Sequence, residues 1–323
     1  MCCGRLLISR RRVVILVGRA MVTLRETASH IKEVREEEWR VLSIIERNLG
    51  RYERFPVERI VRITGYSKEF VDEVIRRLAE YGWVERFLQP YESVRLLTSG
   101  ADAIALRMLA EKNIVVGVGR QIGVGKESDV YEAIGPDGSR LSLKVFRLGR
   151  ISFRDIARKR DYFDASAPNR PSWILRNYMA ARKEFRVLKY LYRCGVSVPK
   201  PIANVKHIIV MEELDGDILI NVRDLPDPRG ILERIIEEVR KAYDAGVVNG
   251  DLSPFNIFIT RDYRVIIIDW PQAIYRDKGA HEDALIRDVT YIAQYFSKKY
   301  GVSVDVESVL REKFGLELRR EGG

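Results

Sequence analysis

A short polar segment separates two apolar runs in VVNGDLSPFNIFI, residues 247–259. Inside it Asp251 and Asn256 stand five positions apart. Asn-Gly and Pro are ordinary turn residues, so a plain connection between two strands is one interpretation. The other interpretation is that a carboxylate and an amide are held between two buried strands for a chemical purpose.

A second acid ends the next apolar run. In VIIIDWPQ, residues 265–272, Asp269 directly follows four branched apolar residues. A carboxylate at the end of a buried strand is costly unless it binds something. Because carboxylate and amide oxygens suit Mg²⁺, Asn256 and Asp269 are candidate ligands of a divalent ion, with Asp251 beside them.

From Ile114 the pattern is that of strands joined by a glycine-rich loop. An alternating run over residues 114–122 precedes GVGKESDVYEAI, a turn and RLSLKVFRL. Gly123 and Gly125 allow backbone N–H groups to approach phosphate oxygens, and Lys126 and Ser128 add a charge and a hydroxyl. The loop is not a Walker loop, because the G-x-x-x-x-G-K-[ST] spacing is absent and no helix follows.

Lys144 lies on the third of these strands, on the face expected below the glycine loop. A lysine that guards an edge strand is the structural alternative. A cation there neutralises phosphates if a carboxylate orients it, and Glu184 is the single acid of the helix predicted over residues 172–194. The order Lys144, Glu184, Asp251, Asn256, Asp269 therefore predicts a phosphotransferase site in which Asp251 orients the nucleophile.

Residues 37–111 are predicted to form three helices, a β-ribbon and a fourth helix, the winged-helix arrangement. The second helix follows Pro56 and is expected to bury Ile60 and Ile63. The third helix, capped by Ser67, would enter a nucleic-acid groove. Its outward side chains carry three cations and four acids, which suits phosphate contact poorly. Protein docking or recognition of RNA shape is expected as readily as DNA reading.

Charge is distributed unevenly along the 323 residues. The net charge is +10, and residues 140–193 hold fifteen Lys and Arg against four acids. A basic block on an otherwise acidic protein suggests a polyanionic partner, with a solvated helix face as the alternative. Residues 147–193 of this block are the expected RNA contact. The loop at their start is expected to settle on rRNA phosphates or to fold over ATP through Arg147, Arg150, Arg154, Arg158, Lys159 and Arg160.

The three cysteines, Cys2, Cys3 and Cys194, form no disulfide framework and no metal spacing, which favours a reducing cytoplasm. No run of eighteen apolar residues occurs, so no membrane span is expected. The first twenty residues are basic with a short apolar patch, but no cleavage site follows. They are expected to be a disordered tail, or an extension upstream of a start at Met21.

The chain resembles the RIO atypical protein kinases. GKESDVY, LKVFRLGRISFR, KRDYFD, VPKP, NGDLSPFNI and IIDWPQ look like motifs of that family, and the winged helix in front resembles its Rio-two subfamily. The resemblance implies an α+β protein in which a winged-helix domain precedes a compact bilobal kinase-like domain. The implied boundaries are a basic tail at 1–29, the winged helix at 30–112, the kinase N-lobe at 113–211 and the C-lobe at 212–323.

The resemblance also implies a serine/threonine kinase with ATPase activity that uses ATP and Mg²⁺, for which Mn²⁺ can substitute. Asp251 would be the catalytic aspartate, and Asn256 and Asp269 the metal ligands. Autophosphorylation is expected at Asp269, as an aspartyl phosphate, or at Ser152. Adenine would meet backbone groups of Glu212 and Leu214. The implied ATP-binding set is Gly123, Gly125, Lys126, Ser128, Lys144, Glu184, Met211, Glu212 and Leu214.

Two residues depart from the family pattern, namely Asn249 in place of a His and Trp270 in place of a Phe. Neither change removes a charged catalytic group, so an active enzyme with altered tuning is expected. No A-P-E segment follows Asp269, which favours ATP hydrolysis as a switch over efficient phosphorylation of diverse proteins.

The role that the resemblance implies is cytoplasmic maturation of the small ribosomal subunit. The partner would be a pre-ribosomal particle of rRNA and ribosomal proteins, with ATP turnover coupled to release. Two alternatives stay open. A small-molecule phosphotransferase of the aminoglycoside-kinase type would need a larger insert than residues 217–246 provide. A winged-helix regulator with a nucleotide-sensing kinase module would need a basic recognition helix.

Overall fold

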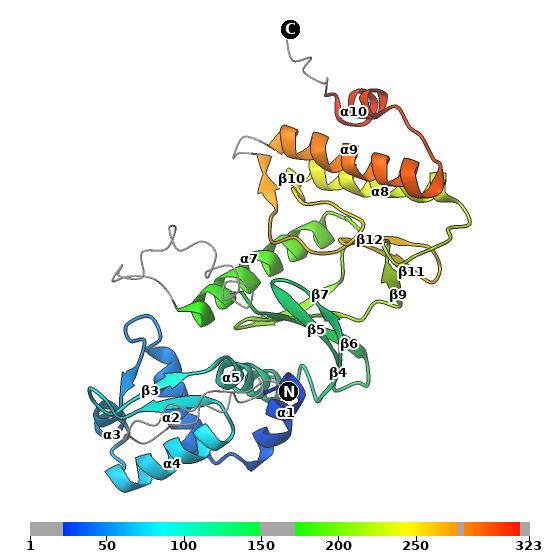
Figure 1. Ribbon diagram of the computed structural model, residues 1–323. Helices are drawn as coiled ribbons and strands as arrows, with labels where there is room; N and C mark the ends of the chain where they lie inside the picture. Colours follow the sequence, from blue (N-terminus) through cyan, green and yellow to red (C-terminus); the bar gives the residue numbers. More distant parts are fainter. Residues whose placement is uncertain (1–21, 149–171, 277–280, 317–323) are drawn as a thin grey trace, which may run out of the picture.

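The structure is a computed structural model that describes residues 22–148, 172–276 and 281–316. Three regions follow one another along the molecule, a winged helix, a five-stranded sheet with one long helix, and a mostly helical C-terminal lobe (Figure 1). This order confirms the predicted α+β class, with a winged-helix domain in front of a bilobal kinase-like domain. The predicted boundaries between these regions stay predictions.

The winged-helix region contains five α-helices and three short strands within the described residues. The strands form a sheet of order β1-β3-β2. The elements are α1 Leu24–His30, a 3₁₀ turn Ile31–Glu33, α2 Glu36–Arg47, β1 Phe55–Pro56, α3 Val57–Thr64, α4 Lys68–Glu80, β2 Val84–Phe87, β3 Ser93–Leu96 and α5 Thr98–Glu111.

Helical spacing explains which side chains of this region form its core. Val71, Val74, Ile75 and Leu78 of α4 are buried and Phe70 is half-buried, and the Ser67 hydroxyl accepts a hydrogen bond from the Phe70 N–H as predicted. The expectation for Ile63 was wrong, because its side chain is 52% exposed. Thr64 instead shares one face of α3 with Ile60 at a four-residue spacing, and its hydroxyl donates to the Ile60 carbonyl.

The N-lobe is an antiparallel sheet of order β4-β5-β6-β8-β7. Its central strand β6 is buried on both faces, because α5 of the winged helix packs on one face and α7 on the other. Leu143 and Val145 face the winged helix, while Lys144 reaches toward α7. The elements are β4 Gly117–Val124, β5 Ser128–Ile134, β6 Arg140–Phe146, α7 Trp173–Arg193, β7 Pro201–Val205 and β8 Ile208–Glu212.

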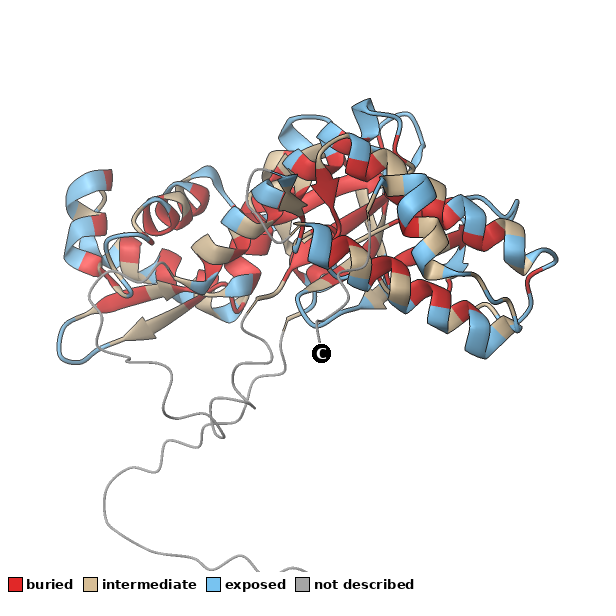
Figure 2. Cartoon of the chain, turned by 90° about the horizontal axis from the view of Figure 1, so that it is seen from above, coloured by how far each residue is buried: buried red, intermediate tan, exposed pale blue. Residues whose placement is uncertain are grey.

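The C-lobe packs its helices on two small sheets, of order β12-β11-β9 and β10-β13. Figure 2 shows that the buried residues line the inner sides of helices and strands, while the exposed residues lie outside. No helix in the described part of the chain is long and apolar enough to cross a membrane. The elements are β9 Gly216–Ile218, α8 Pro228–Asp244, β10 Val247–Val248, β11 Ile257–Thr260, β12 Val265–Ile267, β13 Ile274–Tyr275, α9 His281–Tyr300 and α10 Val306–Phe314.

Candidate active site

Lys144 on β6 lies between two carboxylates that come from different parts of the chain. Its Nζ donates to Glu184 Oε1 at 2.6 Å and to Asp269 Oδ1 at 2.7 Å. The pairing with Glu184, predicted from the sequence, is confirmed. Burial acts to lower the pKa of Lys144, but the two carboxylates outweigh it and hold that pKa above its ordinary value. Lys144 is therefore a fixed cation that joins a carboxylate of α7 to a carboxylate of the C-lobe.

Glu184 on α7 joins the two lobes through one oxygen. Its Oε1 accepts hydrogen bonds from Lys144 and from the Trp270 N–H, at 2.6 and 3.2 Å. Its Oε2 is buried and has no hydrogen-bond partner among the residues that the structure describes. Burial raises the pKa of Glu184, against the pull of Lys144. The position of α7 therefore determines whether Lys144 keeps its charge partner.

Asp269 follows β12 in a left-handed backbone conformation, with φ of +66°. Its carbonyl accepts a hydrogen bond from Asn249 Nδ2 at 3.0 Å, and the next N–H is held by Glu184. The Trp270 indole donates to the Ile267 carbonyl at 3.0 Å. The two residues that depart from the family pattern thus hold Asp269 in place, while its side chain stays 44% exposed.

The polar segment between β10 and β11 holds Asp251 and Asn256 as a rigid loop. The Asp251 N–H donates to Asn249 Oδ1 at 3.2 Å, and Asn256 Nδ2 donates to the Asp251 carbonyl at 2.8 Å. The Asp251 carboxylate is exposed and forms no ion pair or hydrogen bond with the described residues. The loop therefore leaves the Asp251 carboxylate free to contact a substrate hydroxyl or water.

The donor set fits a divalent ion that shares its coordination with a nucleotide. The amide nitrogen of Asn256 donates to the loop backbone, so its amide oxygen is the atom that can bind a metal. In Asp269, Oδ1 contacts Lys144 and Oδ2 can bind a metal. Within the described residues no cluster of three or more His, Cys, Asp or Glu could hold a metal. Mg²⁺ is commonly bound by one or two protein groups together with phosphate oxygens.

Asp288 on α9 holds the backbone of the loop that carries Asp251, and it was not predicted from the sequence. Its two oxygens accept the Gly250 N–H at 2.8 Å and the Leu252 N–H at 3.1 Å. Burial raises the pKa of this carboxyl to about 6. A signal existed in the sequence, because Asp288 interrupts the apolar face that Leu285 and Ile292 form on the same helix.

The glycine loop lies one strand away from Lys144. The sheet register places Gly123 opposite Val130 and Val130 opposite Lys144. The loop closes on itself through the Gly125 N–H, which donates to the Ser128 carbonyl at 2.8 Å. Lys126 is exposed and Ser128 is half-buried, so both can reach a ligand above the sheet.

Adenine was predicted to meet backbone groups of Glu212 and Leu214, and the structure shows which of these groups are still available. The Glu212 N–H already donates to the Lys200 carbonyl at 3.1 Å. The Glu212 carbonyl accepts one hydrogen bond, from the Ser142 hydroxyl at 3.2 Å, and keeps a second lone pair. The Leu214 N–H has no partner in the described part of the chain. One acceptor and one donor are thus available to a purine.

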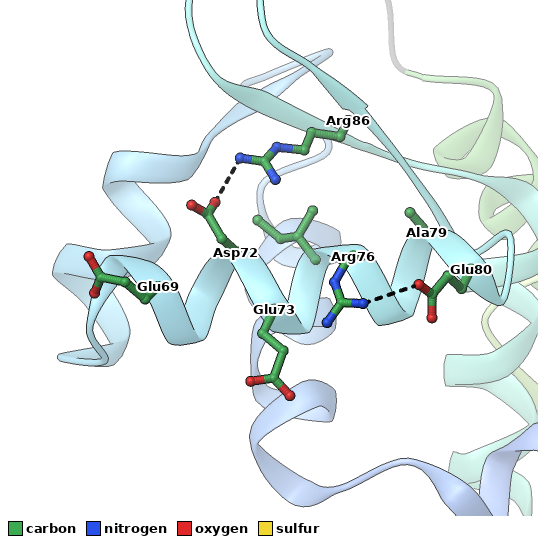
Figure 3. Close-up of a pocket in the computed structure, with 8 residues that line it drawn as sticks. Glu69, Asp72, Glu73, Arg76, Ala79, Glu80 and Arg86 are labelled. Atoms are coloured by element: carbon green, nitrogen blue, oxygen red, sulfur yellow. Dashed lines mark hydrogen bonds and ion pairs between the residues drawn. The ribbon is translucent and has the colours of Figure 1, made fainter.

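The outer face of α4 does not provide a phosphate-binding surface. Figure 3 shows a groove where Glu69, Asp72, Glu73 and Glu80 project beside two guanidinium groups. Both guanidiniums are already engaged, Arg86 with Asp72 at 2.8 Å and Arg76 with Glu80 at 3.6 Å. This arrangement agrees with the excess of acids in the sequence and disfavours groove reading by α4.

Part of the basic block lies outside the described residues. Ser152 and the cations Arg150, Arg154, Arg158, Lys159 and Arg160 all fall there, as does the N-terminal tail before Val22. The predictions about these residues stay predictions. Arg147 is described, and its side chain is buried against Asp102 at 2.7 Å, so the expectation that it meets RNA phosphates was wrong.

Family comparison covers both halves of the chain. The family described as RIO domain matches residues 129–309, and the family described as Rio2, N-terminal, matches residues 31–112. The first match covers more than half of the chain. It includes every catalytic and metal-binding candidate, namely Lys144, Glu184, Asp251, Asn256 and Asp269.

Several curated proteins are similar over most of this chain. Serine/threonine-protein kinase rio2 of Schizosaccharomyces pombe is 35% identical, with 84% of this chain and 78% of that protein covered. RIO-type serine/threonine-protein kinase Rio2 of Methanocaldococcus jannaschii is 34% identical, with 80% and 95% covered. Serine/threonine-protein kinase RIO2 of Caenorhabditis elegans is 35% identical, but the chain spans only 55% of its length.

A solved structure shows the same order of domains. The Rio2 kinase from Chaetomium thermophilum, crystallised as an ADP/Mg²⁺-phosphoaspartate complex, is 33% identical with a TM-score of 0.75, and 86% of this chain and 84% of that chain are covered. Fold, domain order and sequence agree across these comparisons. The chain belongs to the RIO kinase family, in its Rio2 branch.

Proposed function

We propose that this protein is an ATP- and Mg²⁺-dependent serine/threonine kinase with ATPase activity. The observation that carries the proposal is the bridge Glu184–Lys144–Asp269, which spans both lobes beside a loop whose Asp251 carboxylate has no partner among the described residues. Lys144 would hold the phosphates, and Asp251 would accept the proton of the attacking hydroxyl or water. Asn256 and Asp269 would hold Mg²⁺, which when bound neutralises developing charge on the phosphates.

Removal of either metal ligand tests this assignment. Wild-type protein should release phosphate from ATP with Mg²⁺ or Mn²⁺ and should stop when the metal is chelated. Asn256→Ala and Asp269→Asn should each need more metal for half-maximal turnover, because the first removes an oxygen ligand and the second removes the negative charge of one. Phosphate release that is insensitive to chelation, or metal dependence unchanged in both variants, would contradict the proposal.

The structure around the candidate active site suits ATP hydrolysis better than phosphorylation of many different proteins. Between Asp269 and α9 the described chain forms only the two-residue strand β13 and short turns, so little surface is offered to a peptide. The segment between β9 and β10 is a loop and the single helix α8, which leaves no insert for a small-molecule acceptor. The aminoglycoside-kinase alternative is therefore disfavoured.

Asp269 is also proposed as a transient covalent acceptor of the γ-phosphate. Support comes from its exposed carboxylate next to Lys144 and from the phosphoaspartate named for the Chaetomium thermophilum relative. Protein labelled from γ-labelled ATP should lose the label to hydroxylamine, as acyl phosphates do. Label that resists hydroxylamine would instead indicate a hydroxyl such as Ser152.

The proposed partner is a pre-small-subunit ribosomal particle in the cytoplasm, which ATP turnover would release. The support is the family membership together with the basic block of residues 140–193. The protein should co-sediment with small-subunit precursors without hydrolysable ATP and should dissociate once ATP and Mg²⁺ are added. Sedimentation apart from these particles under both conditions would contradict this partner.

A further inference from the structure

The exposed side of α7 carries an unusual row of cations. We call Arg182, Arg186, Lys189 and Arg193 the α7 stripe. They recur at spacings of four, three and four residues, so they share one helix face over about 16 Å at 1.5 Å per residue. All four are exposed, whereas Glu184, the only acid of the helix, is buried on another face.

The α7 stripe has no counter-charge in the described part of the chain. None of its members forms an ion pair there, whereas Arg240 on α8 pairs with Glu237 at 2.7 Å and Arg107 on α5 pairs with Glu36 at 2.8 Å. Like charges four residues apart destabilise a helix slightly. Only Arg193, in the last turn, suits the C-terminal end of the helix, so the fold gains little from the other three cations and a ligand is the more economical explanation.

Flat and apolar side chains lie on the same helix, outside the core. Met179, 65% exposed, lies three residues before Arg182 and so beside the stripe. Tyr192, 44% exposed, lies about a quarter turn from it. Surfaces that bind single-stranded RNA combine a cationic track for the backbone with aromatic side chains on which bases stack.

We propose that the α7 stripe, together with Tyr192 at its edge, is an RNA-binding surface. A membrane is a poorer match, since the apolar side chains are scattered among charges and form no continuous face. The recognition helix α4 presents paired cations and acids instead (Figure 3). The inference rests on the proposed function only in that the pre-ribosomal partner contains RNA.

Helix α7 connects the α7 stripe to the candidate active site and to the winged helix. Ile174 near its start belongs to the winged-helix core, and Leu175 packs against that core. Glu184 at its middle holds Lys144. Figure 1 shows α7 along the sheet between the winged helix and the C-lobe. RNA on the α7 stripe would thus bind the element that orients the ATP-binding lysine.

Charge neutralisation tests the stripe. The variant carries Arg182→Gln, Arg186→Gln and Arg193→Gln in the full chain. The control carries Arg229→Gln, Arg234→Gln and Lys298→Gln, three exposed cations of α8 and α9 that form no ion pair with the described residues. Fluorescence anisotropy with a short single-stranded RNA, without nucleotide, measures affinity over a range of salt concentrations.

The stripe variant should bind this RNA at least tenfold more weakly at about 0.1 M salt. Its log–log salt slope should be shallower by about 2, from roughly 0.7 for each lost phosphate contact. The control should stay within about twofold of wild type. Equal weakening in both variants, or none in the stripe variant, would overturn the proposal. Because ATP is absent, this result is independent of whether the protein hydrolyses ATP.

The aromatic part is tested with Tyr192→Ala. Loss of stacking should weaken RNA binding by about tenfold and leave heparin binding unchanged, since heparin offers charge without bases. If RNA and heparin affinities fall together, or if neither falls, the surface is a general polyanion or acidic-protein site rather than an RNA site. ATP turnover without RNA should match wild type, which shows that the variant is folded.

Discussion

Asp269 holds a backbone conformation that residues with a side chain seldom adopt. Its φ of +66° lies in the left-handed region, which costs of order 1–3 kcal/mol in such a residue. Asn249 supports it from one side through the Asp269 carbonyl, and Glu184 supports the following N–H. The geometry of this proposed metal ligand therefore depends on a residue that differs from the usual His of the family.

Asn249→Ala should lower turnover about tenfold with little effect on ATP binding. The Asp269 carbonyl and the Asp251 N–H would each lose their partner, so the two acidic side chains would no longer be held in register. Asn249→His should recover most of the activity, because an imidazole can also donate and accept. Steady-state kinetics for both variants check this, and equal loss in both would show that Asn249 has a role that a His cannot replace.

The raised pKa of Asp288 implies that stability should fall as the pH rises, whereas activity should rise with it. Its pKa is raised from 3.8 to about 6 by burial, so the protonated form is favoured on folding. This stabilising contribution, about 3 kcal/mol, is complete below pH 4 and lost as the pH rises through 6. Catalysis needs the ionised form, which accepts the Gly250 and Leu252 N–H groups. Turnover should therefore fall as the pH drops below 6.

Asp288→Asn provides the comparison for this pH profile. The amide cannot accept both N–H groups as a carboxylate does, so turnover should be reduced at every pH. The acidic limb assigned to Asp288 should also disappear from the profile of turnover against pH. An identical acidic limb in the variant and in the wild type would show that another group causes it.

At the scale of elements, α7 controls the charge around Lys144. Glu184→Gln keeps the shape of the side chain but leaves Lys144 with Asp269 as its single carboxylate partner among the described residues. Turnover should fall by one to two orders of magnitude. Lys144→Met should be more severe and should also raise the KM for ATP, because the phosphates lose their cation. Measured kcat and KM that are unchanged in Glu184→Gln would contradict this role of α7.

Local pattern was enough to predict much of the fold and the centre of the site. The helical spacing of Val71, Val74 and Leu78 and the alternation along β6 correspond to the structure, since each depends on neighbours a few positions away. Asp288 and the buried contact of Arg147 were not predicted. Each contact joins residues that are 36 to 45 positions apart, and no local period carries that information.

At the scale of the whole molecule, a buried cluster connects the winged helix to the N-lobe. Asp102 on α5 accepts both Arg147 nitrogens at 2.7 Å and contacts His207 Nε2 at 2.6 Å. Burial disfavours the ionised form of Asp102, but Arg147 and His207 hold its pKa below the ordinary value. The Arg147 N–H also donates to the Glu127 carbonyl of the glycine loop at 2.6 Å. The two domains thus share one ionic core.

Asp102→Asn should destabilise the protein by up to about 3–5 kcal/mol, because the buried Arg147 charge loses both of its short contacts and keeps only Asp129, at 3.6 Å. Chemical denaturation measures this loss. Glu132→Gln is the control, since its partner Arg120 is largely exposed and such surface pairs contribute about 0–1 kcal/mol. Similar small losses in both variants would show that the Asp102 cluster does not hold the domains together.

The central claim is that Asp251 acts on the nucleophile, whereas Lys144 and the proposed metal ligands bind ATP without it. Single-turnover phosphate release from γ-labelled ATP tests this in Asp251→Asn, with the exposed acid Asp224→Asn as control. The account predicts that ATP binding stays within a few-fold of wild type while the rate falls by about 10² to 10⁴ in Asp251→Asn alone. A wild-type rate in Asp251→Asn would contradict it.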